Sequence, residues 1–201
     1  MRLGIFGGTF DPPHVGHLIV ADDAAAALGL DRVLFVPAGT HPLKGDRVEA
    51  PSRLRLWMIE AATAGSERFH VDDRELQRTG PSYTVDTLHE LTRENPEAEL
   101  FLLVGSDILA EFDRWHRVQE ITRLATVTVL SRAGVDPDEE DTGIETEFRR
   151  VEVTNVDISS TEVRERIRSG RPYRYLVPQP VYEIIEEHSL YRRSPAERTG
   201  S

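Results

Sequence analysis

Short, continuous runs of apolar residues alternate with helical stretches along most of this chain. The apolar runs lie at residues 2–6, 32–36, 69–71, 100–104, 126–130 and 148–153. Strands of a parallel sheet are buried on both faces and therefore read as unbroken apolar runs, and helices cross over between them. The alternation thus predicts an α/β fold in which one parallel sheet carries helices on both faces.

The stretches between these runs have helical patterns at residues 15–28, 54–64, 85–93, 161–169 and 180–188. Another helical region contains Asp107 and Trp115, and Gly29 is placed to end the first helix. An acidic loop is expected at 135–143. With no internal repeat or long linker, we predict a single domain over residues 1–193 with a small helical C-terminal cap. The polar tail at 194–201 is expected to be disordered.

Composition excludes several classes of site. The chain of 201 residues has no cysteine, which rules out disulfides, thiolate metal sites and a cysteine nucleophile. Its formal net charge of -11 argues against a nucleic-acid partner, because the chain as a whole repels phosphate. No apolar run reaches the roughly 18 residues that a membrane span needs, and no signal-peptide pattern opens the chain. We therefore expect no membrane association and a cytoplasmic location.

The turn after the first strand carries the sequence GGTFDPPHVGH at residues 7–17. Gly7 and Gly8 let the backbone approach a bulky anion closely. His14 and His17, three residues apart at the start of a helix, share one face beside free backbone N–H groups. Gly16 between them leaves room for a ligand ring. The pattern indicates a phosphate site.

Two simpler interpretations of this turn stay open. A pair of glycines alone is typical of a plain tight turn. The two histidines would form a zinc pair only with a third ligand, for which Asp11 is the nearest candidate, although the spacing is not a usual zinc motif.

A second polar motif, DISSTEVR, lies at residues 157–164 near the other end of the chain. Ser159 and Glu162 have the spacing of a capping box, which predicts that a helix begins here. The hydroxyls of Ser160 and Thr161, with Arg164 one turn later, would make a second anion site. A well-capped surface helix is the alternative.

Taken together, the two motifs resemble those of the nucleotidyltransferase superfamily marked by His-x-Gly-His, and in particular the bacterial nicotinate-nucleotide adenylyltransferase family. The resemblance implies a Rossmann-like sheet and an enzyme that joins nicotinate mononucleotide to the AMP part of ATP and releases pyrophosphate. It also implies Mg²⁺, bound mainly through the substrate phosphates. The small-molecule partners would be ATP and nicotinate mononucleotide; homo-oligomerisation stays open.

The same resemblance assigns site residues. The catalytic set is His14, His17, Lys44 and Arg164. The ATP-binding set is Gly7, Gly8, Thr9, Phe10, His14, His17, Gly105, Asp107, Ile158, Ser159, Ser160, Thr161 and Arg164. The set that binds the pyridine mononucleotide is Thr9, Lys44, Thr84 and Trp115. Taken singly, Thr84 could be an ordinary helix start, Asp107 an N-cap and Trp115 a core residue.

Two departures from the family pattern concern the pyridine pocket. Relatives often carry Pro-Pro-His-Lys where this chain has His41-Pro42-Leu43-Lys44, and Lys44 is the only lysine in the sequence. Many also have an aromatic residue where this chain has Glu111.

Alternative functions are a preference for nicotinamide mononucleotide, a phosphopantetheine or cytidylyl transferase, and a catalytically silent nucleotide sensor. The helix start at residues 82–84 favours an anion, so we expect nicotinate to be preferred over nicotinamide.

Overall fold

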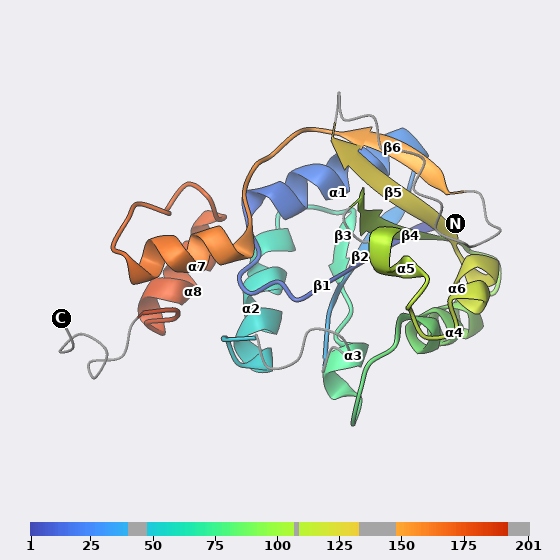
Figure 1. Ribbon diagram of the computed structural model, residues 1–201, viewed down its shortest axis with the longest axis horizontal. Helices are drawn as coiled ribbons and strands as arrows, with labels where there is room; N and C mark the ends of the chain where they lie inside the picture. The colour runs from blue at the N-terminus through green and yellow to red at the C-terminus, as the bar shows by residue number, and fades with distance from the viewer. Residues whose placement is uncertain (40–47, 107–108, 133–147, 193–201) are drawn as a thin grey trace.

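The computed structural model of the protein describes residues 1–39, 48–106, 109–132 and 148–192, and six strands within these ranges form one parallel sheet (Figure 1). The strands are β1 (Arg2–Gly8), β2 (Arg32–Pro37), β3 (Phe69–Val71), β4 (Glu99–Gly105), β5 (Thr126–Arg132) and β6 (Arg149–Val153). Their order is β3-β2-β1-β4-β5-β6, and every neighbouring pair is parallel. The order reverses between β1 and β4, which is where open α/β sheets bind ligands.

Helices cover both faces of this sheet, as the sequence predicts. They are α1 (Val15–Leu28), α2 (Ser52–Thr63), α3 (Arg74–Gln77), α4 (Thr84–Glu94), α5 (Leu109–Phe112), α6 (Val118–Leu124), α7 (Ser160–Arg168) and α8 (Gln179–Glu187). α1 and α2 pack on one face, and α4 with α5 and α6 on the other. The predicted α/β, Rossmann-like fold is confirmed.

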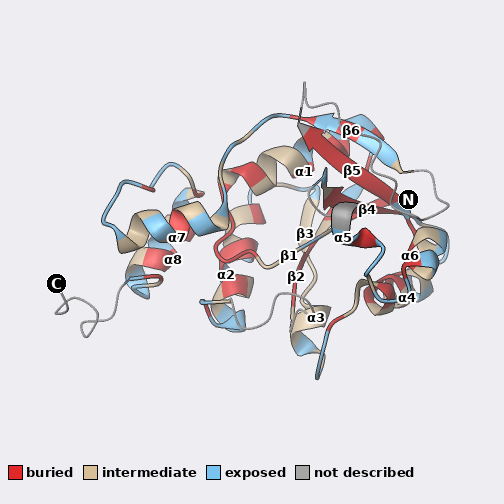
Figure 2. Ribbon diagram, viewed as in Figure 1, coloured by how far each residue is buried: buried red, intermediate tan, exposed pale blue. Residues whose placement is uncertain are grey.

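Two apolar cores follow from the alternation of side chains along each strand. In β2, Val33 and Phe35 point into the core under α1 and α2, whereas Val36 points into the core under α4. In β4, Leu103 and Leu102 divide in the same way. Successive side chains of a strand face opposite sides of the sheet, so a strand in the middle of two helical layers must be apolar at nearly every position. Figure 2 shows the central strands buried and the outer helix faces exposed.

A third apolar cluster joins the helical C-terminal cap to α2. Met58 of α2, Val163 of α7 and Ile185 of α8 are all fully buried in it. The cap lies at one side of the sheet, where α7 and α8 stand next to α2 (Figure 1). A single domain over residues 1–193 remains a prediction.

The helix bounds agree with the sequence except in two places. α1 spans the predicted residues, and Gly29 ends it in the left-handed conformation, with φ of 60°. The short α3 is missed because its sequence, RELQ, has no apolar period. The region around Trp115 is two helices: Arg117 is left-handed, with φ of 55°, and α6 starts after it.

The acidic loop at 135–143 and the tail at 194–201 lie outside the described residues. No helix in the described ranges is both long and apolar enough to cross a membrane.

Candidate active site

The two sequence motifs meet beside the turn that follows β1. The Ser160 hydroxyl donates to the Pro12 carbonyl at 2.8 Å, and Nη1 of Arg164 donates to the Asp11 carbonyl at 2.7 Å. These contacts join residues about 150 positions apart, and they place α7 against the start of α1. The fold therefore builds one polar region from both ends of the chain.

His14 and His17 lie against each other at the N-terminus of α1. Their rings stack with centroids 3.7 Å apart, and the His14 backbone N–H donates to Nδ1 of His17 at 3.1 Å. Because Nδ1 accepts this bond, a neutral His17 carries its proton on Nε2. His17 is therefore held as a hydrogen-bond donor at the helix N-terminus, where donors favour an anion.

Both imidazoles favour the neutral form in the free protein. Burial lowers the pKa of His14 from 6.5 to about 4, although the Glu162 carboxylate acts in the opposite direction. Burial, with the neighbouring His14, also holds the pKa of His17 well below its usual range. Nδ1 of His14 is buried and has no hydrogen-bond partner in the described part of the chain. An anion bound beside the two rings would favour protonation of the pair.

Two expectations for the first turn need correction. Gly16 does not leave room for a ligand ring, since a Cβ there would lie 3.0 Å from Nδ1 of His14 and 3.3 Å from Val156. Its missing side chain instead lets the His14 ring fold against α1. The Phe10 ring is 2% exposed and packs edge-on against His17 and at a tilt against Phe35, so its backbone is the part that could contact a nucleotide.

Helix α7 begins as the capping box predicts. Ser159 is its N-cap, and its side chain accepts from the Glu162 backbone N–H at 3.1 Å. The predicted anion donors of this helix are already engaged within the protein, however. The Ser160 hydroxyl is bonded to the first turn, and Nε of Arg164 donates to Glu49 at 2.9 Å. A phosphate would have to displace the Glu49 carboxylate from Arg164.

The Asp11 carboxylate fastens the first turn to two distant segments. It accepts the backbone N–H groups of Glu49 at 2.7 Å and Ala50 at 3.0 Å, and the Tyr191 hydroxyl at 2.7 Å. Asp11 therefore has a positioning role and is not aimed at the histidines as a zinc ligand. Among the described residues, no group of three or more His, Cys, Asp or Glu side chains could hold a metal ion.

Arg55 of α2 is a second positioning residue, and the sequence analysis missed it. Its side chain is almost fully buried and donates to the Thr9 carbonyl at 2.7 Å and the Ala38 carbonyl at 2.9 Å. Burial lowers the pKa of Arg55, while the Asp11 carboxylate opposes that shift. The guanidinium ties together the ends of β1 and β2. An arginine inside an amphipathic helix pattern gives no signal of this role.

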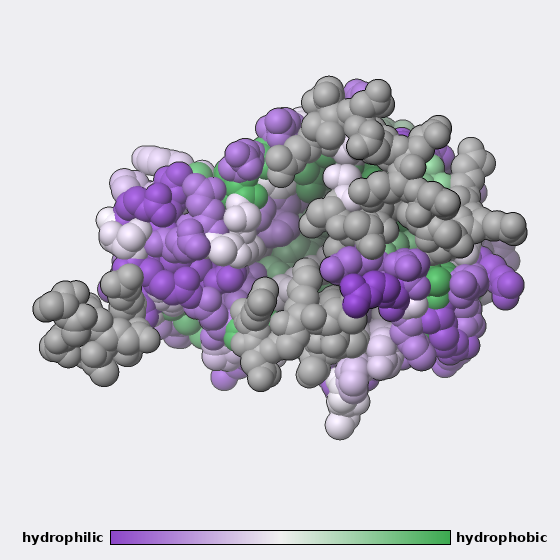
Figure 3. Space-filling view, in the orientation of Figure 1, coloured by the Kyte–Doolittle hydropathy of each residue, from purple (hydrophilic) through white to green (hydrophobic). Residues whose placement is uncertain are grey.

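A cavity of about 140 Å³ opens at the carboxyl ends of β1 and β4, where the strand order reverses. Six of the predicted site residues line it: Gly7, Gly8, Thr9, Thr84, Gly105 and Trp115. Apolar strand residues, Ser82, Thr87 and Glu75 complete its wall. His14, His17 and the residues of α7 are not among those that line it, although Gly7, Gly8 and Thr9 of the same first turn are. In Figure 3 apolar surface is visible in the hollow between the hydrophilic cap and the rest of the molecule.

The acidic residue that lines this cavity is Glu75 of α3. Glu111, which stands where many relatives have an aromatic residue, is exposed and does not line the cavity. Glu75 accepts from the Thr87 hydroxyl at 2.8 Å. Burial raises the pKa of Glu75, and the hydrogen bond from Thr87 and the charge of Arg78 oppose that shift.

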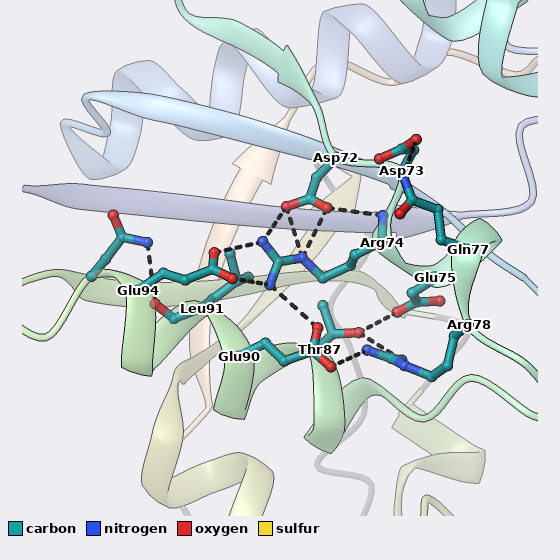
Figure 4. A network of polar contacts seen from close by, with 11 residues as sticks. Asp72, Asp73, Arg74, Glu75, Gln77, Arg78, Thr87, Glu90, Leu91 and Glu94 are labelled. Atoms are coloured by element: carbon teal, nitrogen blue, oxygen red, sulfur yellow. Dashed lines mark hydrogen bonds and ion pairs between the residues drawn. The ribbon is translucent and has the colours of Figure 1, made fainter.

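A network of ion pairs anchors Glu75 to α4 (Figure 4). Arg78 donates to Thr87 at 3.3 Å and to Glu90 at 2.9 Å. Arg74 binds Asp72 at the end of β3 and also Glu94 of α4. The network fixes α3 between the sheet and α4. Gly39 allows this approach, because a Cβ there would lie 2.3 Å from the Glu75 carbonyl oxygen.

Two further predicted residues, Trp115 and Ile158, have side chains in or near a core, and two more lie outside the described residues. Trp115 lines the cavity and also packs on Phe112, with ring centroids 5.2 Å apart. Ile158 packs against the apolar cluster of the cap. Lys44 and Asp107, like His41, lie outside the described residues.

Comparison with known proteins gives a consistent family. The family model described as cytidylyltransferase-like matches residues 5–166. The chain is 43% identical over 190 residues to a probable nicotinate-nucleotide adenylyltransferase of Geobacillus thermodenitrificans, covering 94% of this chain and 86% of that protein. It is 44% identical over 191 residues to a protein of the same name in Corynebacterium kroppenstedtii, covering 94% and 90%.

Solved structures share the fold. Plasmodium falciparum nicotinic acid mononucleotide adenylyltransferase complexed with NaAD superposes with a TM-score of 0.78 at 17% identity, covering 94% of this chain and 97% of that one. A putative nicotinate-nucleotide adenylyltransferase from Vibrio parahaemolyticus gives a TM-score of 0.70 at 20% identity, covering 96% of each chain.

Proposed function

Since the chain belongs to the cytidylyltransferase-like family and, within it, to the nicotinate-nucleotide adenylyltransferases, we propose that it joins nicotinate mononucleotide to the AMP part of ATP. The products are nicotinate adenine dinucleotide and pyrophosphate. The observation that carries the proposal beyond family membership is the meeting of the two motifs, which sets two neutral histidines and Arg164 around one turn next to a cavity.

The reaction needs positioning and charge neutralisation more than a protein nucleophile. A phosphate oxygen of the mononucleotide attacks the α-phosphorus of ATP, a P–O bond forms, and the bond from the α-phosphorus to the bridging oxygen of pyrophosphate breaks. The attacking oxygen is already anionic, so no general base is required. His14 and His17 are assigned to the α-phosphate and the leaving bridge.

The other roles are proposed from the family resemblance. Arg164, Ser160 and Thr161 hold the β,γ end of ATP, and Lys44, outside the described residues, is assigned to the incoming phosphate. The pyridine group enters the cavity lined by Thr84 and Trp115, because a helix N-terminus favours its carboxylate and an indole can stack on its ring.

Phosphate oxygens of the substrates and water would hold a divalent ion, Mg²⁺ in this proposal. The donor set fits this arrangement: the described side chains include no group able to cage an ion, and Mg²⁺ characteristically keeps several waters and binds substrate phosphates. When bound, the ion neutralises charge on the phosphates.

Two other functions remain as outcomes of a test. A related transferase would use phosphopantetheine or CTP, and a silent sensor would bind nucleotide without turnover. We would measure pyrophosphate release with ATP or CTP and each candidate acceptor. Release only with ATP and a pyridine mononucleotide supports the proposal; release only with another pair, or none at all, refutes it.

The role of the histidines is tested by His17→Ala. We expect turnover to fall by about 10²-fold or more, on the scale of losing a positioned transition-state donor. His188→Ala, which alters an exposed histidine after α8, is the control and should leave turnover unchanged. Near-normal turnover in a folded His17→Ala protein would contradict the assignment.

Substrate preference is tested by kcat/KM for the two pyridine mononucleotides at equal salt. We expect nicotinate to be preferred by at least about tenfold, or roughly 1.4 kcal/mol, because a site that satisfies a charged group leaves donors unpaired with an amide. Equal values or a nicotinamide preference would overturn this expectation. Glu75, which lines the cavity, would then be the residue to replace.

A further inference from the structure

A single carboxylate bridges two arginines at the phosphate region. Glu49 accepts from Nε of Arg164 at 2.9 Å and from Nη2 of Arg168 through both of its oxygens. Arg164 and Arg168 are one turn apart on α7 and share the same oxygen of Glu49. Their guanidinium groups therefore converge on a space that one anionic group can fill.

The bridge has the chemistry of a phosphate site. Planar guanidinium groups bind carboxylate and phosphate oxygens with the same geometry. Nη1 of Arg164 is held by the Asp11 carbonyl and Nη2 lies 3.3 Å from the Thr161 hydroxyl, so the group is fixed next to the first turn. One carboxylate faces two guanidinium groups, which leaves an excess of positive charge for a more highly charged anion.

The Glu49 side chain can leave without disturbing its backbone. The backbone N–H of Glu49 is bonded to Asp11 at 2.7 Å, independently of the carboxylate. The side chains of Glu49 and Arg168 are 34% and 33% exposed, so a ligand from solvent can reach them. Burial favours a higher pKa for Glu49, but the hydrogen bonds and charges of Arg168 and Arg164 outweigh it and hold the pKa below its ordinary value. The carboxylate is an anion at neutral pH.

We propose that Arg168 is a second cation for the polyphosphate end of ATP, and that Glu49 is an internal anion which occupies the Arg164–Arg168 pair until the phosphates displace it. This inference rests on the proposed function, because it assigns ATP to the same site. Glu49 keeps two like charges together on α7 in the free enzyme. Displacing the Glu49 carboxylate from the two arginines costs free energy when ATP binds. The contacts of a polyphosphate with the arginines offset this cost, whereas AMP makes no such contacts.

The test is calorimetric titration of the free enzyme with inorganic tripolyphosphate and, separately, with AMP. Glu49→Gln removes the competing charge at constant shape, and we expect it to tighten tripolyphosphate binding about fivefold. Arg168→Gln should weaken that binding about tenfold. Neither change should alter AMP affinity.

Arg166→Gln is the matched control, because Arg166 lies on the same helix but pairs with Glu162 at 2.7 Å. It should leave tripolyphosphate affinity unchanged. Melting temperatures of all variants identify unfolded protein. Glu49→Ala is measured as well, because the amide of Glu49→Gln could still accept hydrogen bonds from the two arginines.

Three results would overturn the inference: unchanged binding in Glu49→Gln and Glu49→Ala, weaker binding in both, or unchanged binding in Arg168→Gln. The binding assay needs neither a pyridine substrate nor turnover. If the variants behave as expected but the enzyme releases no pyrophosphate with any pyridine mononucleotide, the arginine pair stands and the proposed function fails. If turnover with a pyridine mononucleotide is normal but the variants' affinities for tripolyphosphate do not change, the proposed function stands and the role of the arginine pair fails.

Discussion

Trp115 has a side chain that serves both the core and the cavity. It packs on Phe112 and reaches the cavity wall at the end of β4. The chain has one other tryptophan, Trp57, which is 43% exposed on α2 and faces His188. Comparing substitutions of the two tryptophans therefore distinguishes the loss of stacking on a ligand from the general effect of removing an indole.

Replacing Trp115 by alanine should raise KM for nicotinate mononucleotide about fivefold and leave KM for ATP unchanged, because an aromatic stack contributes about 1 kcal/mol beyond burial. Steady-state kinetics with each substrate varied in turn gives both constants. Trp57→Ala is the control and should change neither. Equal increases for both substrates would make Trp115 a core residue only.

The two histidines make stability depend on pH. The pKa of His14 is lowered from 6.5 to about 4, so between these values the unfolded chain binds a proton that the folded protein does not. The free energy of unfolding should therefore fall as the pH drops from about 6.5 to about 4, by about 3 kcal/mol for His14. Above 6.5 this contribution is fully present.

Urea unfolding at several pH values measures this loss, and His14→Gln should reduce the slope between pH 6.5 and 4. Subtracting the variant's curve of unfolding free energy against pH from that of the unchanged protein removes the contribution of carboxylates that titrate in the same range. His188→Gln, at an exposed position, should retain the original slope. A His14→Gln protein with the full slope would show that other groups cause it.

At the scale of elements, the first turn is held by contacts from residues that follow it by 46 and by 180 positions. Arg55 from α2 binds its Thr9 carbonyl, and Tyr191, which follows α8, binds Asp11. The cap is thereby linked to the turn that carries the histidines. Its apolar cluster on α2 forms a second link.

Tyr191→Phe removes the hydroxyl from the buried Asp11 carboxylate, which keeps its two backbone donors. We expect the free energy of unfolding to fall by about 1–3 kcal/mol, the usual effect of removing one partner of a buried charged hydrogen bond. Tyr175→Phe, at a side chain 88% exposed, is the control. Equal stability of both variants would mean that the Asp11–Tyr191 bond does not contribute.

At the scale of the whole molecule, the cap and the sheet share α2, and we predict that they unfold together as one domain. Trp57 reports on α2 and the end of α8, and Trp115 on the sheet side. Fluorescence of the Trp115→Phe protein, which keeps Trp57, then follows α2 and the end of α8 alone. Fluorescence of the Trp57→Phe protein, which keeps Trp115, follows the sheet side alone. The two denaturant curves should coincide after correction for each variant's stability, because a shared core makes unfolding cooperative.

Distinct midpoints for far-ultraviolet circular dichroism and fluorescence within one variant would contradict this prediction. Such a result would divide the chain at the junction between β6 and α7.

The sequence by itself determined the layers of the fold and its family. Unbroken apolar runs such as 100–104 are typical of strands buried between two helical layers, and the motifs at 7–17 and 157–164, taken together, identify a family. It also placed the ends of α1 and the N-cap of α7, because capping depends on residues three or four positions apart.

Only the tertiary structure decided which partners the polar side chains take. Glu49, Arg55, Glu75 and Tyr191 were not predicted, since each acts on an atom brought close by folding rather than by spacing. The same holds for Gly16, whose free space is filled by the His14 ring. Local patterns are set by backbone geometry over a few residues, whereas burial and charge pairing depend on every segment that packs around a site.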